Sequence, residues 1–320
     1  MSCFRLLSPA TSLCCAMLLA QDAPPPIARV PVRLVIAPTS VTDEHGNFVN
    51  GLTADNFTLY DNEILQQIHE DADFLPISLV VAIQNNLDLQ GFLPKIHQLG
   101  PLLGTLVVGE GGEAAILTFN QKVETIQDFT SDLGRLSHAL KLVETSYSKS
   151  HLIDATLQSI HLLKSRPPER RRILLLISET RDQGSESKLR DAVAEAEVNN
   201  ILIYSMNVSR AHAASQIFNG GIDIMALIKE IYGGIKTAVV ENPLSVLTRY
   251  TGGRQYSFYK QHAFEDAVIK IGEEVHGQYL LGYTPSNIQE QGYHKIRVEL
   301  NKSATEYTVR SRPGYYSTDN

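Results

Sequence analysis

The chain has 320 residues, of which 43% are hydrophobic and 20% are charged, and its formal net charge is −7. This length allows one large domain or two ordinary ones, and this composition is normal for a soluble globular protein. Binding to nucleic acid needs clustered positive charge, and the sequence has no long basic run, so we expect no nucleic-acid partner. The short basic stretch Arg170–Arg172 precedes an apolar segment, and we interpret it as a solvated strand entrance rather than a phosphate site.

The first residues have the pattern of a secretory leader. All three cysteines fall within "MSCFRLLSPATSLCCAMLLA", which combines one arginine, a short apolar core and a small residue, Ala20. We therefore predict a signal peptide over residues 1–20 and a flexible Pro-rich start over residues 21–29. A secreted or extracytoplasmic location, in the periplasm or at the cell surface, follows from this prediction. Beyond the leader no segment approaches ~20 unbroken apolar residues, so no transmembrane span is expected.

Both ends of the remaining chain favour β-structure. Residues 30–75 contain short alternating segments, and "FTLYDNEILQQIHE" predicts a hairpin around Asp61 and Asn62. Residues 277–316 contain three further strand patterns, which should be antiparallel because no long helix separates them. We predict a small β-domain that is built from the N-terminal and C-terminal strands together.

The middle of the chain, residues 76–276, alternates between apolar strands and amphipathic helices. The strands are apolar on both faces, which requires a sheet covered by helices on both sides. We predict an α/β domain with a doubly wound, mostly parallel sheet. Residues 211–246 are predicted to be a partly helical insertion packed on the domain edge, and the alternative is a lid over a partner or ligand. The strand segments are "SLVVAI", "EAAILTF", "RRILLLIS" and "ILIYSMNV".

Three polar segments follow strands or precede helices in this domain. They are "QNNLD" at 84–88, "SYSKSHLID" at 146–154 and "SETRDQGS" at 178–185. Ligands of open α/β sheets bind at the carboxyl ends of the strands, near the point where the strand order reverses. We therefore expect these segments to form one face.

This arrangement resembles the von Willebrand factor type A domain over residues 77–276. In that family an Asp-x-Ser-x-Ser motif, a Thr and a later Asp form a metal-ion-dependent adhesion site. The whole chain also resembles the bacterial VWFA-related domain proteins of the acidobacterial type, which implies a secreted or surface protein without a firm activity. The segments that carry this second resemblance are "VTDEHGNFVNGLTADNFTLYDNEILQQI", "QYLLGYTPSN", "GYHKIRVEL" and "YTVRSRPGYYS".

The resemblance places the first metal-binding motif on residues 84–88, where the residue types depart from the family. Gln84 takes the place of the Asp, Asn86 that of the first Ser and Asp88 that of the second Ser. A hard dication is held mainly by full negative charge, and Gln84 offers only a neutral carbonyl oxygen. The alternative interpretation is that Gln84, Asn85 and Asn86 hydrogen-bond the neighbouring loops and shape this face.

The other two segments supply the remaining family positions. Ser150 stands where the family has its Thr, Glu179 takes the place of the last Asp, and Asp182 is retained. Through Asp88, Ser150 and Glu179 the face could hold Mg²⁺ or Mn²⁺. We expect this site to be lost or weak, and we expect no cofactor.

We predict a non-enzymatic protein-binding module, because no Gly-x-Ser-x-Gly or His-Glu-x-x-His motif is present. The first alternative is a metal-dependent hydrolase that uses Glu179 or Asp182. The second is a structural envelope protein that self-associates through residues 211–246. In the favoured prediction the face presented to a protein partner, whose identity the sequence does not give, consists of Gln84, Asn85, Asn86, Asp88, Ser150, Glu179 and Asp182.

Overall fold

The central sheet has six strands in the order β10-β9-β8-β5-β6-β7. The computed structural model describes residues 34–71, 75–208, 242–257, 263–286, 291–301 and 307–317. Within this sheet the described pairs are parallel, except that the edge strand β7 runs antiparallel to β6. The strands are β5 (Ile77–Gln84), β6 (Glu113–Phe119), β7 (Val123–Thr130), β8 (Arg171–Ser178), β9 (Ile201–Asn207) and β10 (Gln255–Ser257).

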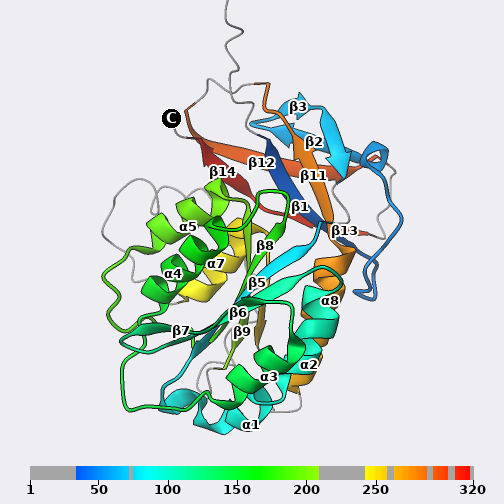
Figure 1. Ribbon diagram of the computed structural model, residues 1–320. Coiled ribbons are helices and arrows are strands. Elements are labelled where there is room, and N and C mark those ends of the chain that lie inside the picture. The colour runs from blue at the N-terminus through cyan, green and yellow to red at the C-terminus, as the bar shows by residue number, and fades with distance from the viewer. Residues whose placement is uncertain are drawn as a thin grey trace, which may run out of the picture. The chain divides into compact units, whose positions relative to one another are not determined.

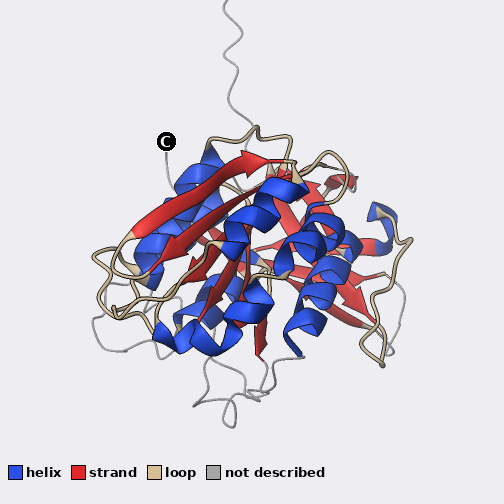
Figure 2. Ribbon diagram, turned by 60° about the horizontal axis from the view of Figure 1, so that its bottom comes forward, coloured by secondary structure: helices blue, strands red, loops and turns tan. Residues whose placement is uncertain are grey.

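Helices cover both faces of this sheet (Figure 1), and Figure 2 shows the strands between two layers of helix. Alternate side chains of β5 enter two different apolar clusters, Leu79 and Val81 on one face and Val80 and Ala82 on the other. This alternation is the period of a β-strand, and it explains why β5 is apolar at nearly every position. The predicted doubly wound, mostly parallel sheet is confirmed.

The helices divide between the two faces as the clusters require. The first face carries α1 (Leu93–Ile96), α2 (Leu99–Leu102), α3 (Leu133–Lys141) and α8 (Ala263–Gly277). The second face carries α4 (Leu152–Lys164), α5 (Leu189–Val198) and α7 (Pro243–Thr251). Two short segments flank α1 and α2, a 3-10 helix over Leu87–Phe92 and a π-helix over Leu103–Val108.

Two antiparallel four-stranded sheets form a β-sandwich from both ends of the chain. Their orders are β13-β1-β11-β4 and β14-β12-β2-β3, and they enclose a third apolar cluster. The predicted small β-domain is therefore confirmed, although its exact boundaries stay a prediction. The strands are β1 (Val35–Thr42), β2 (Phe57–Asp61), β3 (Ile64–Gln66), β4 (Ile68–Asp71), β11 (Tyr279–Tyr283), β12 (Gly292–Leu300), β13 (Thr308–Ser311) and β14 (Gly314–Ser317).

The predicted hairpin is the β2–β3 pair. Asn62 and Glu63 form its two-residue turn with φ of 48° and 63°, the positive values that a tight hairpin turn of this length requires. Strand β14 was not predicted. Pro313 and Gly314 break the sequence pattern there, and the strand is defined by its pairing with β12.

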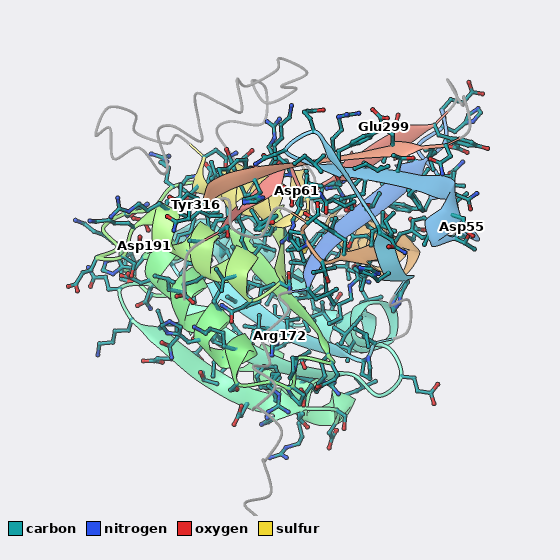
Figure 3. The ribbon with its side chains drawn as sticks, turned by 90° about the horizontal axis from the view of Figure 1, so that it is seen from above. Asp55, Asp61, Arg172, Asp191, Glu299 and Tyr316 are labelled. Atoms are coloured by element: carbon teal, nitrogen blue, oxygen red, sulfur yellow. The ribbon has the colours of Figure 1, made fainter. Side chains whose placement is uncertain are left out.

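A carboxylate is fully buried inside the sandwich. Asp61 accepts hydrogen bonds from the hydroxyls of Tyr283 and Tyr315 at 2.9 Å each, and lies 2.7 Å from Nδ1 of His294. Figure 3 shows Asp61 among the strands and Asp55 at the outer edge. A buried carboxylate is tolerated only when donors surround it, and these three side chains provide them.

Several predictions fall on residues that the structure does not describe. The predicted leader 1–20, the Pro-rich start 21–29 and residues 211–241 of the predicted insertion lie outside the described residues. Residues 243–246 belong to α7, so the predicted insertion does not extend to residue 246. The helix ends at Gly252, which has φ of 88°. Among the described helices, none combines the length and the apolar character that crossing a membrane requires.

The interpretation of Arg170–Arg172 as a solvated strand entrance is wrong for Arg171. This side chain is only 9% exposed. Its guanidinium donates to the carbonyl of Val275 and to Oε1 of Gln278. The start of β8 is therefore packed against the region where α8 leads into β11.

Candidate functional site

The three polar segments meet at the carboxyl edge of the sheet, as predicted. Strand β5 lies between β6 and β8, so the ends of these strands are adjacent. The amide of Ser146 donates to the carbonyl of Asn85 at 3.0 Å, and the amide of Gln183 donates to that of Ser150 at 2.8 Å. These bonds join the loop at 146–151 to both of its neighbours. We call the resulting surface, formed by residues 84–88, 146–151 and 178–185, the carboxyl-edge face.

Gln84 is the central connector of this face. Its side chain is fully buried, and its Oε1 accepts from Oγ of Ser178 at 2.7 Å and from the amide of Glu179 at 3.0 Å. Its Nε2 donates to Oδ1 of Asn86 at 2.7 Å. The side-chain amide of Gln84 therefore joins the end of β5 to the end of β8 and to the loop that follows β5. For Gln84 alone, these contacts agree with the alternative interpretation, in which the amides bond the neighbouring loops.

Asn86 continues the chain of hydrogen bonds toward Asp88. Its Nδ2 donates to Oδ2 of Asp88 at 2.8 Å, and its Oδ1 accepts from the backbone amide of Asp88 at 3.2 Å. The second bond makes Asn86 the N-cap of the 3-10 helix over Leu87–Phe92. Asn85 is held through its backbone, which bonds Phe119 and Ser146. In the described part of the chain, its buried side-chain Oδ1 has no hydrogen-bond partner.

Two carboxyl groups lie together on this face. Burial raises the pKa of Glu179, the charge and a hydrogen bond of Asp88 raise it further, and the positive charge of Arg181 opposes them. Asp88 is exposed, whereas Glu179 is half-buried. Because like charges disfavour each other, a cation beside this pair or a proton on Glu179 would be favourable.

Ser150 contributes an unused oxygen. Its side chain is fully buried, and its Oγ has no hydrogen-bond partner among the residues that the structure describes. A buried hydroxyl usually has one, so an unpartnered Oγ is a group that could serve a ligand. Ser150 occupies the position that the family resemblance gave to the Thr, but its role stays a prediction.

Asp182 bonds the start of α4 and the loop after β8. Its Oδ1 accepts from the amide of Ile153 at 3.2 Å and from Oγ of Ser185 at 2.5 Å, and its Oδ2 accepts from the amide of Ser185 at 3.1 Å. Oγ of Ser185 in turn accepts from the amide of Asp154 at 3.1 Å. The pair therefore caps the first turn of α4, whose amides have no partner within the helix. The described contacts do not connect Asp182 to Gln84.

Sequence reasoning missed two serines of this face. Ser178 bonds Gln84, and Ser185 works with Asp182. For Ser178 a signal was present, because it is the polar residue that ends the apolar run of β8. For Ser185 a signal was present as well, because "ETRDQGS" resembles the family's Asp-Gly-x-Asp-x-x-Ser stretch, which ends in a serine.

Two of the oxygens at the metal-binding positions that the family resemblance assigned are already bonded within the protein. The oxygens of Gln84 and Asn86 each accept two hydrogen bonds from protein groups, and an amide nitrogen lies between them. Among the described residues, no group of three or more His, Cys, Asp or Glu side chains could hold a metal. The oxygens left are those of Asp88, Glu179 and Ser150, which are fewer than an octahedral site needs unless several waters remain.

Comparisons with known proteins add a likeness in fold. No family model and no curated protein matches the chain. A von Willebrand factor type A structure from Catenulispora acidiphila is 6% identical, with a TM-score of 0.49, over 91% of this chain and 64% of that one. BatB from Bacteroides thetaiotaomicron is 13% identical, with a TM-score of 0.41, over 62% of this chain and 97% of that one. At these identities nothing follows about activity, partner or metal.

A third similar structure is an aerotolerance-related membrane protein from Bacteroides fragilis. It is 14% identical, with a TM-score of 0.41, over 62% of this chain and 99% of that one. The class of protein is set by the topology described above, a mostly parallel sheet with helices on both faces and added antiparallel sheets. The described residues form a mostly parallel α/β sheet covered by helices on both faces, together with a small β-domain of two antiparallel sheets.

Proposed function

We propose that this chain is a non-enzymatic, secreted or surface-exposed protein-binding module whose carboxyl-edge face takes up a basic side chain of a protein partner. The observation that carries the proposal is the carboxyl pair of Asp88 and Glu179. The pair lies at the carboxyl ends of the strands, where open α/β sheets bind their ligands. The predicted leader supports export of the chain.

The negative charge of Asp88 and Glu179 determines which kind of partner group this face would bind. Burial, and next the negative charge of Asp88, raise the pKa of Glu179, and Arg181 only partly opposes them, so a further positive charge beside the pair would be favourable. A lysine ammonium or an arginine guanidinium from a partner would supply that charge and would form charge-assisted hydrogen bonds with both acids. Because Asp88 is exposed, such a group can reach the pair from solvent.

The hydrolase alternative gains no support from this geometry. It requires Glu179 or Asp182 to act with a metal, and the carboxylate of Asp182 is occupied with the first turn of α4. A catalytic centre also needs a nucleophile, a base and oxyanion donors that converge on one point. The self-association alternative depends on residues 211–246, most of which lie outside the described residues.

The first experiment selects peptides from a random displayed library on three forms of the protein. These are the wild type, the double variant Asp88→Asn/Glu179→Gln, and a control double variant Glu110→Gln/Glu144→Gln that removes two exposed acids elsewhere. We expect the wild type and the control to enrich peptides rich in lysine and arginine, and the site variant to lose this enrichment. Equal enrichment by all three forms would overturn the proposal.

The second experiment tests the metal separately. Calorimetric titration of wild type with Mg²⁺ and with Mn²⁺ is run beside Glu179→Ala. We expect no saturable binding in either protein, because the oxygens of Gln84 and Asn86 are already bonded. Saturable binding in the wild type that disappears in Glu179→Ala would show that a metal site survives. Recognition would then proceed through the ion, not through a direct contact with a basic side chain.

A further inference from the structure

A cavity of about 230 Å³ lies at the amino ends of β8 and β9, at the opposite end of β8 from Ser178. The sandwich contributes residues from β1 and β11 to its wall, so the cavity is at the seam between sandwich and central sheet. It is therefore separate from the carboxyl-edge face. Its apolar lining consists of Ile36, Pro38, Leu75, Pro168, Val198, Leu202 and Leu280, and its polar lining of Arg170, Arg171, Arg172, Asn199, Asn200, Thr251 and Arg312.

Three of the four lining arginines are already bonded to the protein. Arg170 donates to Oγ of Ser78 at 2.7 Å and pairs with Glu113 at 3.3 Å. Arg171 and Arg172 donate to oxygens that include backbone carbonyls. Neutral carbonyls fix a guanidinium in place without cancelling its charge. Arg170 is the exception, because the carboxylate of Glu113 offsets its charge.

Arg312 differs from these three. It is only 2% exposed, and its guanidinium forms no hydrogen bond or ion pair with any other residue that the structure describes. Its nearest described aromatic contact is Tyr315, with the guanidinium carbon 5.7 Å from the ring centre. Burial lowers the pKa of Arg312, and the charge of Glu197 opposes this effect.

A buried cation without hydrogen-bond acceptors is costly, and such groups are normally paired. Arg312 lines the cavity, so an anion inside the cavity would be its natural partner. A planar guanidinium matches the two oxygens of a carboxylate through parallel N–H bonds. Glu197 acts on Arg312 through its charge but accepts no hydrogen bond from it, so the guanidinium donors stay open to a ligand carboxylate, and the apolar lining residues call for an apolar body.

We propose that the seam cavity binds a small monocarboxylate, with its carboxylate on Arg312 and its apolar body against Ile36, Leu202 and Leu280. The size of the cavity supports this class, because binding pockets for larger ligands usually measure ≈300–1,000 Å³. The proposal is independent of the proposed function, since no residue of the carboxyl-edge face takes part.

Calorimetric titration of the full chain tests this proposal with three probes: benzoate, its neutral isostere benzamide, and inorganic phosphate. We expect saturable binding of benzoate with one site per chain, and no measurable binding of benzamide or phosphate. Arg312→Met should weaken benzoate binding at least about tenfold. Arg135→Gln removes an exposed arginine elsewhere and should bind benzoate as the wild type does.

A second variant keeps the test decisive if Arg312→Met fails to fold. Val198 is 43% exposed and lines the cavity, so Val198→Phe narrows the cavity while every arginine stays in place. This variant should fold like the wild type and should also weaken benzoate binding at least about tenfold. The proposal is overturned if the wild type does not bind benzoate, or if benzamide or phosphate binds as well as benzoate. Unchanged benzoate affinity in folded Arg312→Met or Val198→Phe would also overturn it.

Discussion

Replacing Gln84 by leucine tests whether this amide holds the carboxyl-edge face together. The substitution keeps the approximate volume of a fully buried side chain and removes three hydrogen bonds. The amide of Glu179 then has no acceptor in the described contacts. Oγ of Ser178 can still donate to the carbonyl of Glu179 at 2.9 Å, and Oδ1 of Asn86 still accepts from Asp88.

The expected cost follows from these contacts. One orphaned buried amide costs about 1–3 kcal/mol, and two further lost hydrogen bonds cost about 1 kcal/mol each. Burying leucine in place of an amide returns about 1 kcal/mol. The free energy of unfolding should therefore fall by about 2–4 kcal/mol. A change within about 0.5 kcal/mol of wild type would refute the reasoning.

Urea unfolding followed by far-UV circular dichroism measures this cost. With a slope of about 3 kcal/mol per molar urea, at the upper end for small proteins, the midpoint should fall by about 1 M. The matched control is Gln90→Leu, an exposed glutamine of the neighbouring 3-10 helix, which should change the free energy of unfolding by no more than about 0.5 kcal/mol. If the control loses as much as Gln84→Leu, the loss reflects a general intolerance of leucine in this segment.

Three further predictions concern single acids. Burial and Asp88 raise the pKa of Glu179 above its ordinary 4.5, so stability present below pH 4.5 is lost as the pH rises through the raised value. Glu179→Gln should therefore match wild type near pH 4 and exceed it at pH 8 in urea midpoints; an equal difference at both pH values would contradict this. Asp61→Asn should lower the free energy of unfolding by about 2–4 kcal/mol, against little change for exposed Asp55→Asn. Asp182→Ala should cost about 1–2 kcal/mol and speed hydrogen exchange at the amides of Ile153 and Ser185, and unchanged exchange would argue against the capping role.

The sequence was most informative where burial acts on both faces of a strand. Strands β5, β8 and β9 are largely apolar because helices cover both sides of the sheet. A continuous apolar run of this kind can be recognised in the sequence. Strand β14 has no such apolar run in the sequence. Its existence depends on pairing with β12, from which β13 separates it along the chain, and Pro313 interrupts the local pattern.

The candidate site was predictable in position but not in detail. The carboxyl ends of parallel strands meet at one edge, so the segments of Gln84, Ser150 and Glu179 could be placed together from sequence. The direction of each side chain depends on the neighbouring loop, which is why Asp182 bonds α4. Arg312 had no local signal at all, because the cavity that it lines is assembled by the joining of sandwich and sheet.

The residue at position 84 decides how this face can work. A carboxylate there could still accept from Ser178 and Glu179, but it would add a third acid near Asp88 and Glu179, which a bound cation would have to compensate. An amide accepts and donates at once, so Gln84 links β5, β8 and Asn86 without any net charge. In the proposed function, Asp88 and Glu179 receive a positive charge that comes from outside the chain.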